Sequence, residues 1–444
     1  MQNKIIEKLR NYENIAILGF GKEGQSTYNF IRKYDKNLKL TILDKEYIDI
    51  KDINTRYKVF NSEEDLKEFD LIIKTPGIAI TNFSLETKNK ITSQMELLLE
   101  FNRENVIGIT GTKGKSTTSS LIYNIFKDQL KDVFLVGNIG VPVLDNIDKY
   151  DNAIIVAEMS SHQLETVKYS PHVGIILNLF LDHLDHAGSV ENYHKSKMNI
   201  IKYQETNDYA IYDADNYYLQ KQDFSNVKSK LLSVSLNNKA YIYMEENGDI
   251  YINDKFLLKR DRIVTSLKGE HNLKNIMFAL LVANIYNLNL EKTLESIKKF
   301  KPLEHRMEYV GKYKDIIFYN DVIATIPEAT INACKTLKNI DTLIFGGMDR
   351  NIEYKEFIDY LNNSNISHFI CMPTTGYKIG QFLDKKRVIL VDTLEEAVKK
   401  AFEVTKKDSI CLLSPAASSY EYFKNFEEKG NKYKELIKKY GFDN

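Results

Sequence analysis

Residues 106–117 read VIGITGTKGKST, which is the pattern of a strand, a glycine-rich loop and the start of a helix. An apolar run leads into a glycine-rich loop, and the pattern TSSLIYNIF at 118–126 continues as a helix. Backbone N–H groups at such a helix N-terminus bind polyphosphate, the Lys115 ammonium reaches the outer phosphates, and a hydroxyl at Ser116 or Thr117 can ligate Mg²⁺. Gly108 and Gly114 are one residue too far apart for the generic GxxxxGK[ST] loop. We therefore predict a distinct ATP site made by Gly111, Thr112, Lys113, Gly114, Lys115, Ser116 and Thr117.

Apolar runs of strand length recur on both sides of this loop, alternating with helical patterns, and that alternation predicts parallel α/β sheets. Three α/β domains are expected, at residues 1–96, 97–301 and 302–444. Residues 205–265 alternate around an Asn247-Gly248 turn and predict a small antiparallel insertion. The predicted strands are Ile15–Leu18, Leu40–Leu43, Leu71–Ile73, Val106–Ile109, Val133–Val136, Ile154–Ala157, Val173–Leu177, Thr342–Phe345, His368–Cys371, Arg387–Val391 and Ile410–Leu413.

Composition excludes several classes of protein. The chain has 444 residues, with 61 Lys plus Arg and 61 Asp plus Glu, so no global field attracts nucleic acid or anionic lipid. No apolar run is long enough for a membrane span, and residues 1–14 carry both signs of charge where a secretory signal needs an apolar core. The three cysteines form no CxxC pair. We expect a soluble, monomeric cytoplasmic protein that acts on small molecules.

A second glycine motif lies near the N-terminus. Gly19, Gly21 and Gly24 form GxGxxG between a strand and a helix, and Asp44 ends the next strand 20 residues after Gly24. This is the dinucleotide fingerprint, with room for a phosphate at the helix N-terminus and an acidic side chain for ribose hydroxyls. The same geometry serves any nucleotide diphosphate, so NAD is one answer among several.

Five of the eight histidines fall in one short stretch that also contains four other candidate ligands. Glu158 and His183 follow predicted strands, and the carboxyl edge of an open α/β sheet is where ligands bind. We therefore predict a metal-phosphate site with Glu158 and His183, whereas His172 and His194 are expected at the surface. The group comprises His162, His172, His183, His186 and His194 with Glu158, Asp182, Asp185 and Lys197.

Collinear motifs over essentially the whole chain resemble the Mur ligases. They are GITGTKGKST, VGNIGVP, AEMSSHQLE, LNLFLDHLDHAGS, YHKSKMNI, GEHNLKNIMFA, EHRME and SPAASSYEYFKNFEEKG. Folylpolyglutamate synthetase shares the TGTxGK loop and the domain plan but lacks the GNIG, SSxQLE and SPAxxSxxxFxxF segments, and it is the second candidate family. A nicotinamide oxidoreductase and a non-catalytic nucleotide sensor are two further hypotheses. An oxidoreductase would not need the GTKGKST loop, and a sensor would not need Glu158 together with His183.

The resemblance implies an ATP-dependent carbon–nitrogen ligase of peptidoglycan precursor synthesis, which adds D-glutamate to UDP-N-acetylmuramoyl-L-alanine through an acyl phosphate. It implies a Rossmann-like UDP-sugar domain, a central ATPase domain and a Rossmann-like domain that contacts amino acid and nucleotide. Two Mg²⁺ ions are implied, with Ser116, Glu158, His183 and a carbamylated Lys197 as ligands. Further nucleotide contacts are implied at Asn272, His305, Arg306 and Asp321, and UDP-substrate contacts at Gly19, Phe20, Gly21, Gly24, Asp44, Thr75, Asn138 and His183.

Two segments depart from the family pattern around the amino-acid site. The pattern NDSKATN is NDVIATI at residues 320–326, and GGxxK is GGMDR at residues 346–350. Arg350 is therefore the candidate for the D-glutamate side-chain carboxylate, because its planar fork can bind a carboxylate bidentately. Thr325, Ser419 and Phe426 complete the predicted amino-acid site.

Overall fold

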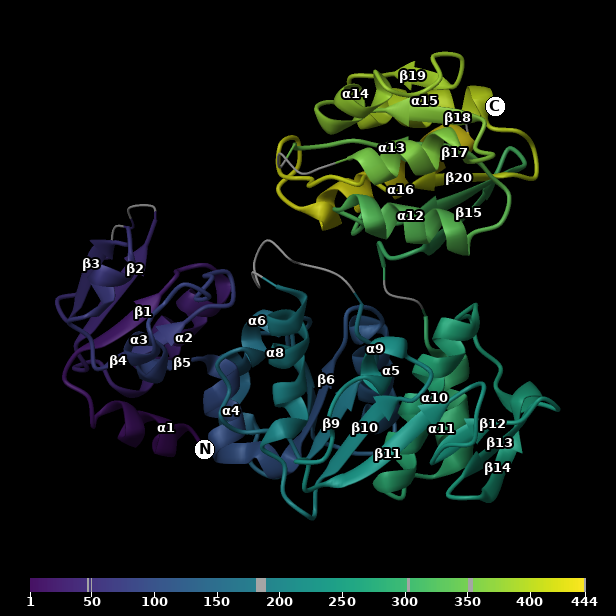
Figure 1. Cartoon of the computed structure of the whole chain (residues 1–444). Coiled ribbons are helices and arrows are strands. Elements are labelled where there is room, and N and C mark those ends of the chain that lie inside the picture. The colour runs from purple at the N-terminus through teal and green to yellow at the C-terminus, as the bar shows by residue number, and fades with distance from the viewer. Residues whose placement is uncertain (46–47, 49, 181–188, 302–303, 350–353, 443–444) are drawn as a thin grey trace. The chain divides into compact units, whose positions relative to one another are not determined.

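A computed structural model describes residues 1–45, 48, 50–180, 189–301, 304–349 and 354–442, except for the side chain of Glu328. The chain forms two compact units, Met1–Phe300 and Lys301–Asn444. The first unit contains two sheets and the second contains one (Figure 1). Among the described residues, none of the helices has both the length and the hydrophobicity of a transmembrane segment.

The N-terminal sheet of the first unit is parallel, with strand order β3-β2-β1-β4-β5. The order reverses at β1, and such a switch point is where open α/β sheets bind ligands. The GxGxxG turn lies there, between β1 and α2. The elements are α1 (Gln2–Leu9), β1 (Ile15–Leu18), α2 (Lys22–Tyr34), β2 (Leu40–Asp44), β3 (Thr55–Val59), η1 (Glu63–Leu66), β4 (Leu71–Lys74), α3 (Leu85–Lys90) and β5 (Ile91–Thr92).

The central sheet has strand order β14-β13-β12-β11-β10-β9-β6-β8-β7. Its elements are α4 (Gln94–Asn102), η2 (Arg103–Asn105), β6 (Val106–Thr110), α5 (Lys115–Lys127), β7 (Val133–Gly137), η3 (Val143–Lys149), β8 (Ile154–Glu158), α6 (Ser161–Leu164), β9 (Val173–Ile176), α8 (Val190–Lys202), β10 (Tyr209–Asp213), α9 (Tyr217–Gln220), β11 (Lys230–Ser235), β12 (Ile242–Met244), β13 (Asp249–Ile252), β14 (Lys255–Lys259), η4 (Arg260–Arg262), α10 (Glu270–Ile285) and α11 (Leu290–Lys299).

The prediction of an antiparallel insertion at residues 205–265 was wrong in part. Strands β10 and β11 are parallel to β9 and extend the main sheet, and only β12–β14 pair antiparallel. The hairpin at Asn247-Gly248 is confirmed, because Gly248 has φ +85° between β12 and β13. The antiparallel pattern is thus the edge of the central sheet and not a separate insertion.

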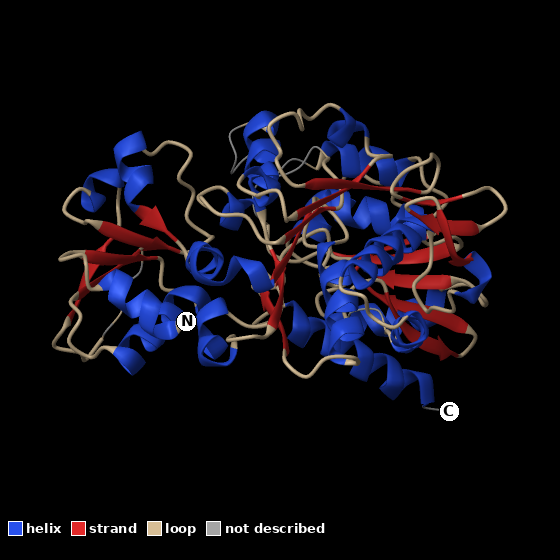
Figure 2. Cartoon of the chain, turned by 90° about the horizontal axis from the view of Figure 1, so that it is seen from below, coloured by secondary structure: helices blue, strands red, loops and turns tan. Residues whose placement is uncertain are grey.

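Alternating side chains of the central strands bury two opposite faces. In β6, Val106 belongs to the same buried cluster as Ile200 of α8, whereas its neighbour Ile107 belongs to the cluster that contains the apolar side chains of α5 and α10. Helices therefore cover both faces of the strands (Figure 2). Helix α10 is buried through most of its length, from Leu273 to Ala283, which explains its nearly continuous apolar sequence. This packing fixes the carboxyl edge of the sheet, where the phosphate loop lies.

The second unit has strand order β15-β16-β20-β17-β18-β19, antiparallel only between β15 and β16. Its buried cysteines, Cys334, Cys371 and Cys411, are free thiols. The elements are β15 (Glu308–Tyr313), β16 (Ile316–Asn320), α12 (Pro327–Thr336), β17 (Ile340–Phe345), α13 (Lys355–Asn362), β18 (His368–Cys371), α14 (Thr375–Gly380), β19 (Val388–Leu390), α15 (Leu394–Val404), β20 (Ile410–Leu413) and α16 (Phe426–Phe442).

Candidate active site

The loop between β6 and α5 has the geometry of a phosphate cradle. Gly111 and Gly114 have φ values of +153° and +83°, which L side chains rarely adopt. A Cβ on Gly114 would lie 2.9 Å from Oδ1 of Asn275, so the loop packs directly on α10. Asn178, after β9, accepts the Lys113 N–H at 2.8 Å and holds the loop from the other side. The first N–H groups of α5 can therefore bind a ligand above the sheet edge, because a helix does not use them for its own hydrogen bonds.

Two lysine ammonium groups converge on one backbone oxygen of this loop. Lys115 donates to the carbonyls of Gly111 and Thr112 at 2.9 and 3.1 Å. Lys197 on α8 donates to the same Gly111 oxygen at 2.9 Å and lies 4.7 Å from the ring of Tyr193. Lys197 is only 1% exposed, so it is not an ordinary surface lysine. Both ammonium groups therefore lie at the phosphate loop, where they could contact a bound polyphosphate.

Glu158 ends β8 beside the phosphate loop, because Glu158 pairs with Ile109 of β6. Its carboxylate is fully buried. Asn138 donates to Oε1 at 2.7 Å, while Oε2 has no hydrogen-bond partner in the described part of the chain. A buried carboxylate oxygen without a donor is costly unless a cation binds it. Glu158 therefore fits a hard-metal ligand such as one for Mg²⁺, and Asn138 orients it.

The N-terminal glycine turn is equally tight. A Cβ on Gly19 would lie 2.1 Å from Oγ1 of Thr75, and one on Gly24 would lie 2.1 Å from the Gly19 oxygen. The Asp44 carboxylate accepts the Phe20 N–H at 2.6 Å, so this acid orders the turn. The structure brings these residues together at the switch point of the sheet, and they leave the N-terminus of α2 accessible to a phosphate group.

Polar side chains connect this turn to the central sheet. Gln163 of α6 donates to Glu23 at 3.0 Å, and Lys74 at the end of β4 pairs with Glu165 at 3.0 Å. Burial lowers the pKa of Lys74 and raises that of Glu23, and the Glu165 charge partly offsets the first shift. Because Glu165 and Gln163 follow Glu158 by only a few residues, these contacts join the N-terminal glycine turn to the segment that follows β8. Sequence analysis missed these residues, although Gln163 and Glu165 lie in the AEMSSHQLE motif.

Comparison with known proteins agrees with this geometry. Residues 109–283 match the family model of the Mur ligase middle domain, and residues 305–417 match that of the Mur ligase glutamate ligase domain. The chain is 34% identical over 424 residues to a UDP-N-acetylmuramoylalanine–D-glutamate ligase from Caldanaerobacter subterraneus subsp. tengcongensis, covering 91% of this chain and 92% of the relative. The chain belongs to the Mur ligase family.

A second relative with the same name, from Clostridioides difficile, is 32% identical and covers 96% of this chain and 98% of its own. Among solved structures, the MurF ligase of Thermotoga maritima in complex with ADP has a TM-score of 0.60 at 18% identity, covering 96% of this chain and 95% of that one. A MurF of Acinetobacter baumannii gives 0.61 at 14% identity, covering 97% and 98%. These likenesses show that the whole chain has the Mur ligase fold.

The four residues that the Mur ligase resemblance links to the nucleotide are divided between the two units. Asn272, in the first turn of α10, donates to Lys268 O at 2.7 Å. In the second unit, buried Asp321 accepts hydrogen bonds from Ser414 and from the Met307 N–H. Burial raises the pKa of Asp321 to about 7. His305 is buried and Arg306 has a buried Nε without a hydrogen-bond partner among described residues.

The predicted D-glutamate residues lie in the second unit. Thr325 is half-buried, and Phe426, at the start of α16, packs its ring 6.1 Å from that of His305. Ser419 is buried, and its hydroxyl has no hydrogen-bond partner in the described structure. Arg350 and His183 lie outside the described residues, as do Asp182, Asp185 and His186.

The prediction that His172 and His194 are surface residues was wrong for His194, whereas His172 is half-buried. His194 is 6% exposed, with Nε2 at 3.3 Å from Phe180 O, and burial lowers its pKa. His194 lies three residues before Lys197 on α8, and that spacing places both side chains on one helix face. This periodicity was the available signal for its burial.

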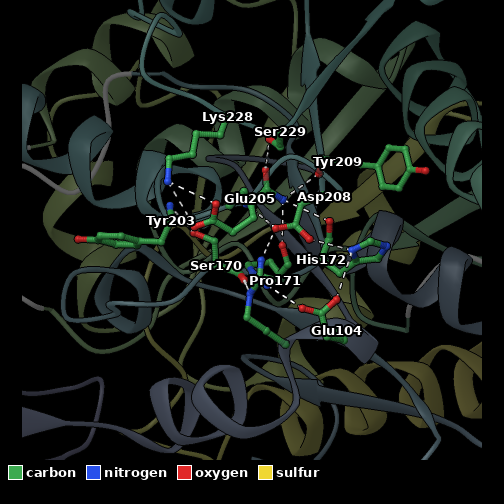
Figure 3. A network of polar contacts seen from close by, with 12 residues as sticks. Glu104, Ser170, Pro171, His172, Tyr203, Glu205, Asp208, Tyr209, Lys228 and Ser229 are labelled. Carbon is green, nitrogen blue, oxygen red and sulfur yellow. Dashed lines mark hydrogen bonds and ion pairs between the residues drawn. The ribbon is translucent and has the colours of Figure 1, made fainter.

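His172 belongs to a polar network at the opposite edge of the sheet (Figure 3). It contacts Asp208 at 2.8 Å, with Glu104 at 3.9 Å, and the three offer a possible ligand set. Arg103 already pairs with Asp208, and the Glu205 N–H donates to the same carboxylate. These residues precede strands β6, β9 and β10, whereas the phosphate loop follows β6. The network therefore stabilises the amino edge of the sheet.

Proposed function

We propose that this protein is an ATP-dependent ligase that joins D-glutamate to UDP-N-acetylmuramoyl-L-alanine. The similarity to two relatives of that name, over more than nine-tenths of each relative's length, carries the proposal. The neighbouring phosphate loop and buried Glu158 support it, because such a ligase must bring a polyphosphate and a carboxylate together. The product would be the precursor UDP-N-acetylmuramoyl-L-alanyl-D-glutamate.

The proposed reaction has two steps. The terminal carboxylate of UDP-N-acetylmuramoyl-L-alanine attacks the γ-phosphorus of ATP, which gives an acyl phosphate and ADP. The amine of D-glutamate then attacks the acyl carbon, loses a proton and expels inorganic phosphate as the amide forms. Both steps join anions, so the protein must offset their repulsion and hold the reacting groups in line.

The phosphate loop would supply that compensation. The N–H groups that open α5, from Gly114 to Thr117, would bind the phosphates, and Lys115 would leave the Gly111 and Thr112 carbonyls to bind the transferred group. Those carbonyls hold the Lys115 ammonium at the loop. The ammonium is thus already positioned before the nucleotide binds.

The residues around Glu158 fit Mg²⁺. Buried Oε2 of Glu158 has no hydrogen-bond donor among described residues, and Asn138 fixes the opposite oxygen. Mg²⁺ would neutralise charge on the phosphates and the acyl group. Ser116 is the proposed hydroxyl ligand at the helix start. Lys197 as a carbamate and His183 are proposed for a second ion.

The UDP part of the substrate would occupy the N-terminal glycine turn, with Gly19, Gly21, Gly24, Asp44 and Thr75 around it. A substrate that reaches from this turn to Glu158 fits the side-chain connection through Gln163 and Lys74. We accordingly assign residues 1–96 to the UDP-sugar, 97–301 to ATP and catalysis, and 302–444 to D-glutamate and further nucleotide contacts. The GxGxxG motif would then hold UDP and not NAD.

Phosphate release tests the proposal. The purified protein should release phosphate only when ATP, Mg²⁺, UDP-N-acetylmuramoyl-L-alanine and D-glutamate are all present. L-glutamate, D-aspartate and D-alanine replace D-glutamate in parallel reactions, and a folate with L-glutamate replaces both substrates in another. Turnover only with the folate would establish the folylpolyglutamate synthetase-like ligase, and calorimetric NAD binding would reopen the oxidoreductase.

A further inference from the structure

A pocket of about 190 Å³ lies within the second unit, at the ends of β17, β18 and β19. Its wall is largely apolar, and two polar side chains, Ser419 and Lys429, reach it from the SPAASSYEYFKNFEEKG motif. The lining comprises Gly346, Gly347, Met372, Pro373, Asp392, Thr393, Leu394, Ser419, Tyr422, Phe423 and Lys429. A small molecule with a short hydrocarbon stem and an anionic end would match this lining.

The floor of the pocket is bare backbone. Gly346 and Gly347 have φ values of +128° and +149°. A Cβ on Gly346 would lie 2.2 Å from Met372 O, and one on Gly347 would lie 2.3 Å from Ser418 O. Glycine is thus required at both positions for the chain to pass this close to its neighbours. The shape of the pocket therefore depends on these two glycines.

Lys429 is the charged group of this pocket. Its side chain is 2% exposed, and its Nζ donates to Gly346 O at 3.0 Å. In the described residues, no carboxylate lies within salt-bridge distance of it. An ammonium has three donors, and burial without a counter-ion lowers the pKa of Lys429 to about 7. Such a buried cation is expensive, and a bound anion would reduce its cost.

Ser419 adds a second donor. Its hydroxyl is buried and has no partner in the described part of the chain. A buried hydroxyl without a partner is uncommon in folded proteins and points to a ligand or a bound water. Asp392, on the rim, is exposed and accepts the Tyr377 hydroxyl at 2.6 Å, so its charge is screened by solvent.

We propose that Lys429 binds a carboxylate of the amino-acid substrate, with the Ser419 hydroxyl as the second donor. The inference rests on the proposed function and assigns to it a residue for which the family resemblance gave no role. The ammonium would rotate its remaining donors toward the carboxylate while it keeps the Gly346 carbonyl. Met372, Leu394 and Phe423 would pack on the methylene groups of glutamate. Lys429 is therefore a substrate-binding and specificity-determining residue.

Lys429→Met tests the proposal, because methionine keeps most of the side-chain length without the charge. The KM for D-glutamate should rise about 10- to 100-fold, the cost of a charged hydrogen bond, while the KM values for ATP and the UDP-substrate stay within about twofold. Lys429→Arg should recover part of the affinity. The matched control is Lys432→Met on the same helix, where the lysine is exposed and pairs with Glu435; it should leave all constants unchanged.

Three other results would separate the explanations. No D-glutamate-dependent turnover in the wild type would overturn the proposed function itself. An active wild type with an unchanged KM for D-glutamate in Lys429→Met, or with all constants shifted together, would mean that Lys429 only clamps the Gly346 loop. Binding of inorganic phosphate that is lost in Lys429→Met, while the KM for D-glutamate stays unchanged in that variant, would assign the pocket to phosphate and overturn the inference. If Lys429→Met does not unfold cooperatively, Ser419→Ala carries the test, and an unchanged KM for D-glutamate there overturns the inference.

Discussion

Glu158→Gln tests whether the buried Glu158 carboxylate, which lowers the stability of the metal-free protein, serves as a metal ligand. The wild-type carboxylate is fully buried, with one oxygen held by Asn138 and the other without a described partner. An unsatisfied buried group costs about 1–3 kcal/mol, and more when charged. Glutamine can still accept from Asn138 and removes the charge. The metal-free variant should therefore be as stable as the wild type or more stable by about 1 kcal/mol.

The same substitution should remove the response to metal. A ligand at ten times its Kd stabilises the native state by about 1.4 kcal/mol, and that corresponds to a melting-temperature rise of about 3–6 °C for a large domain. Differential scanning fluorimetry with and without Mg²⁺ and ATP should show this rise in the wild type and little of it in Glu158→Gln. Phosphate release should fall about 100- to 1000-fold.

Glu96→Gln is the matched control, because Glu96 on α4 is also buried with an unpartnered Oε2, but its nearest cation is Lys168 and it is not among the proposed metal ligands. Glu96→Gln should keep both the metal response and turnover. A Glu158→Gln protein that retains the Mg²⁺-ATP shift and turns over within about threefold of the wild type would refute the metal-ligand role.

Particular side chains give four more tests. Gly24→Ala should weaken binding of the UDP-substrate at least about tenfold by calorimetry, because its Cβ would lie 2.1 Å from a backbone oxygen of the same turn. Lys197→Ala should lose turnover and regain part of it with added acetate or another short carboxylate, and full activity without rescue would exclude the carbamate. Arg350→Ala should raise the KM for D-glutamate about 10- to 100-fold without changing that for ATP. Burial raises the pKa of Glu96 to about 7, so the native state binds this proton more tightly than the unfolded chain does. The wild type should therefore lose stability as the pH rises from about 4.5 to 7. Melting curves over that range should show that Glu96→Gln loses less stability than the wild type, by up to about 3 kcal/mol.

Much of the fold could be predicted because the parallel strands are apolar runs between helical patterns. The predicted Ile15–Leu18, His368–Cys371 and Ile410–Leu413 match the observed strands at both ends. Strands β10 and β11 were read as antiparallel because they carry Tyr, Lys and Ser and lie next to a true hairpin. Pairing partners of such short, mixed strands depend on tertiary contacts that the local pattern does not contain.

The candidate site could be predicted only where its chemistry is local in sequence. Gly111 to Thr117 and Glu158 stand next to recognisable strands, so their placement at the sheet edge followed from the pattern. Lys429 and Lys74 did not stand out, because lysine is usually a surface residue. Their burial results from packing against segments far away in sequence, at Gly346 for one and at Glu165 for the other.

The most direct test of the proposed ligase activity is to identify the product of a single reaction by mass spectrometry. The wild-type protein, incubated with Mg²⁺, ATP, UDP-N-acetylmuramoyl-L-alanine and D-glutamate, should convert the UDP-substrate into a species heavier by one glutamyl residue, with one ADP and one phosphate formed per molecule. Lys115→Ala should give none of this product, although its melting curve remains cooperative. ATP hydrolysis without a glutamyl product, or product formation by Lys115→Ala at the wild-type rate, would contradict the proposed activity.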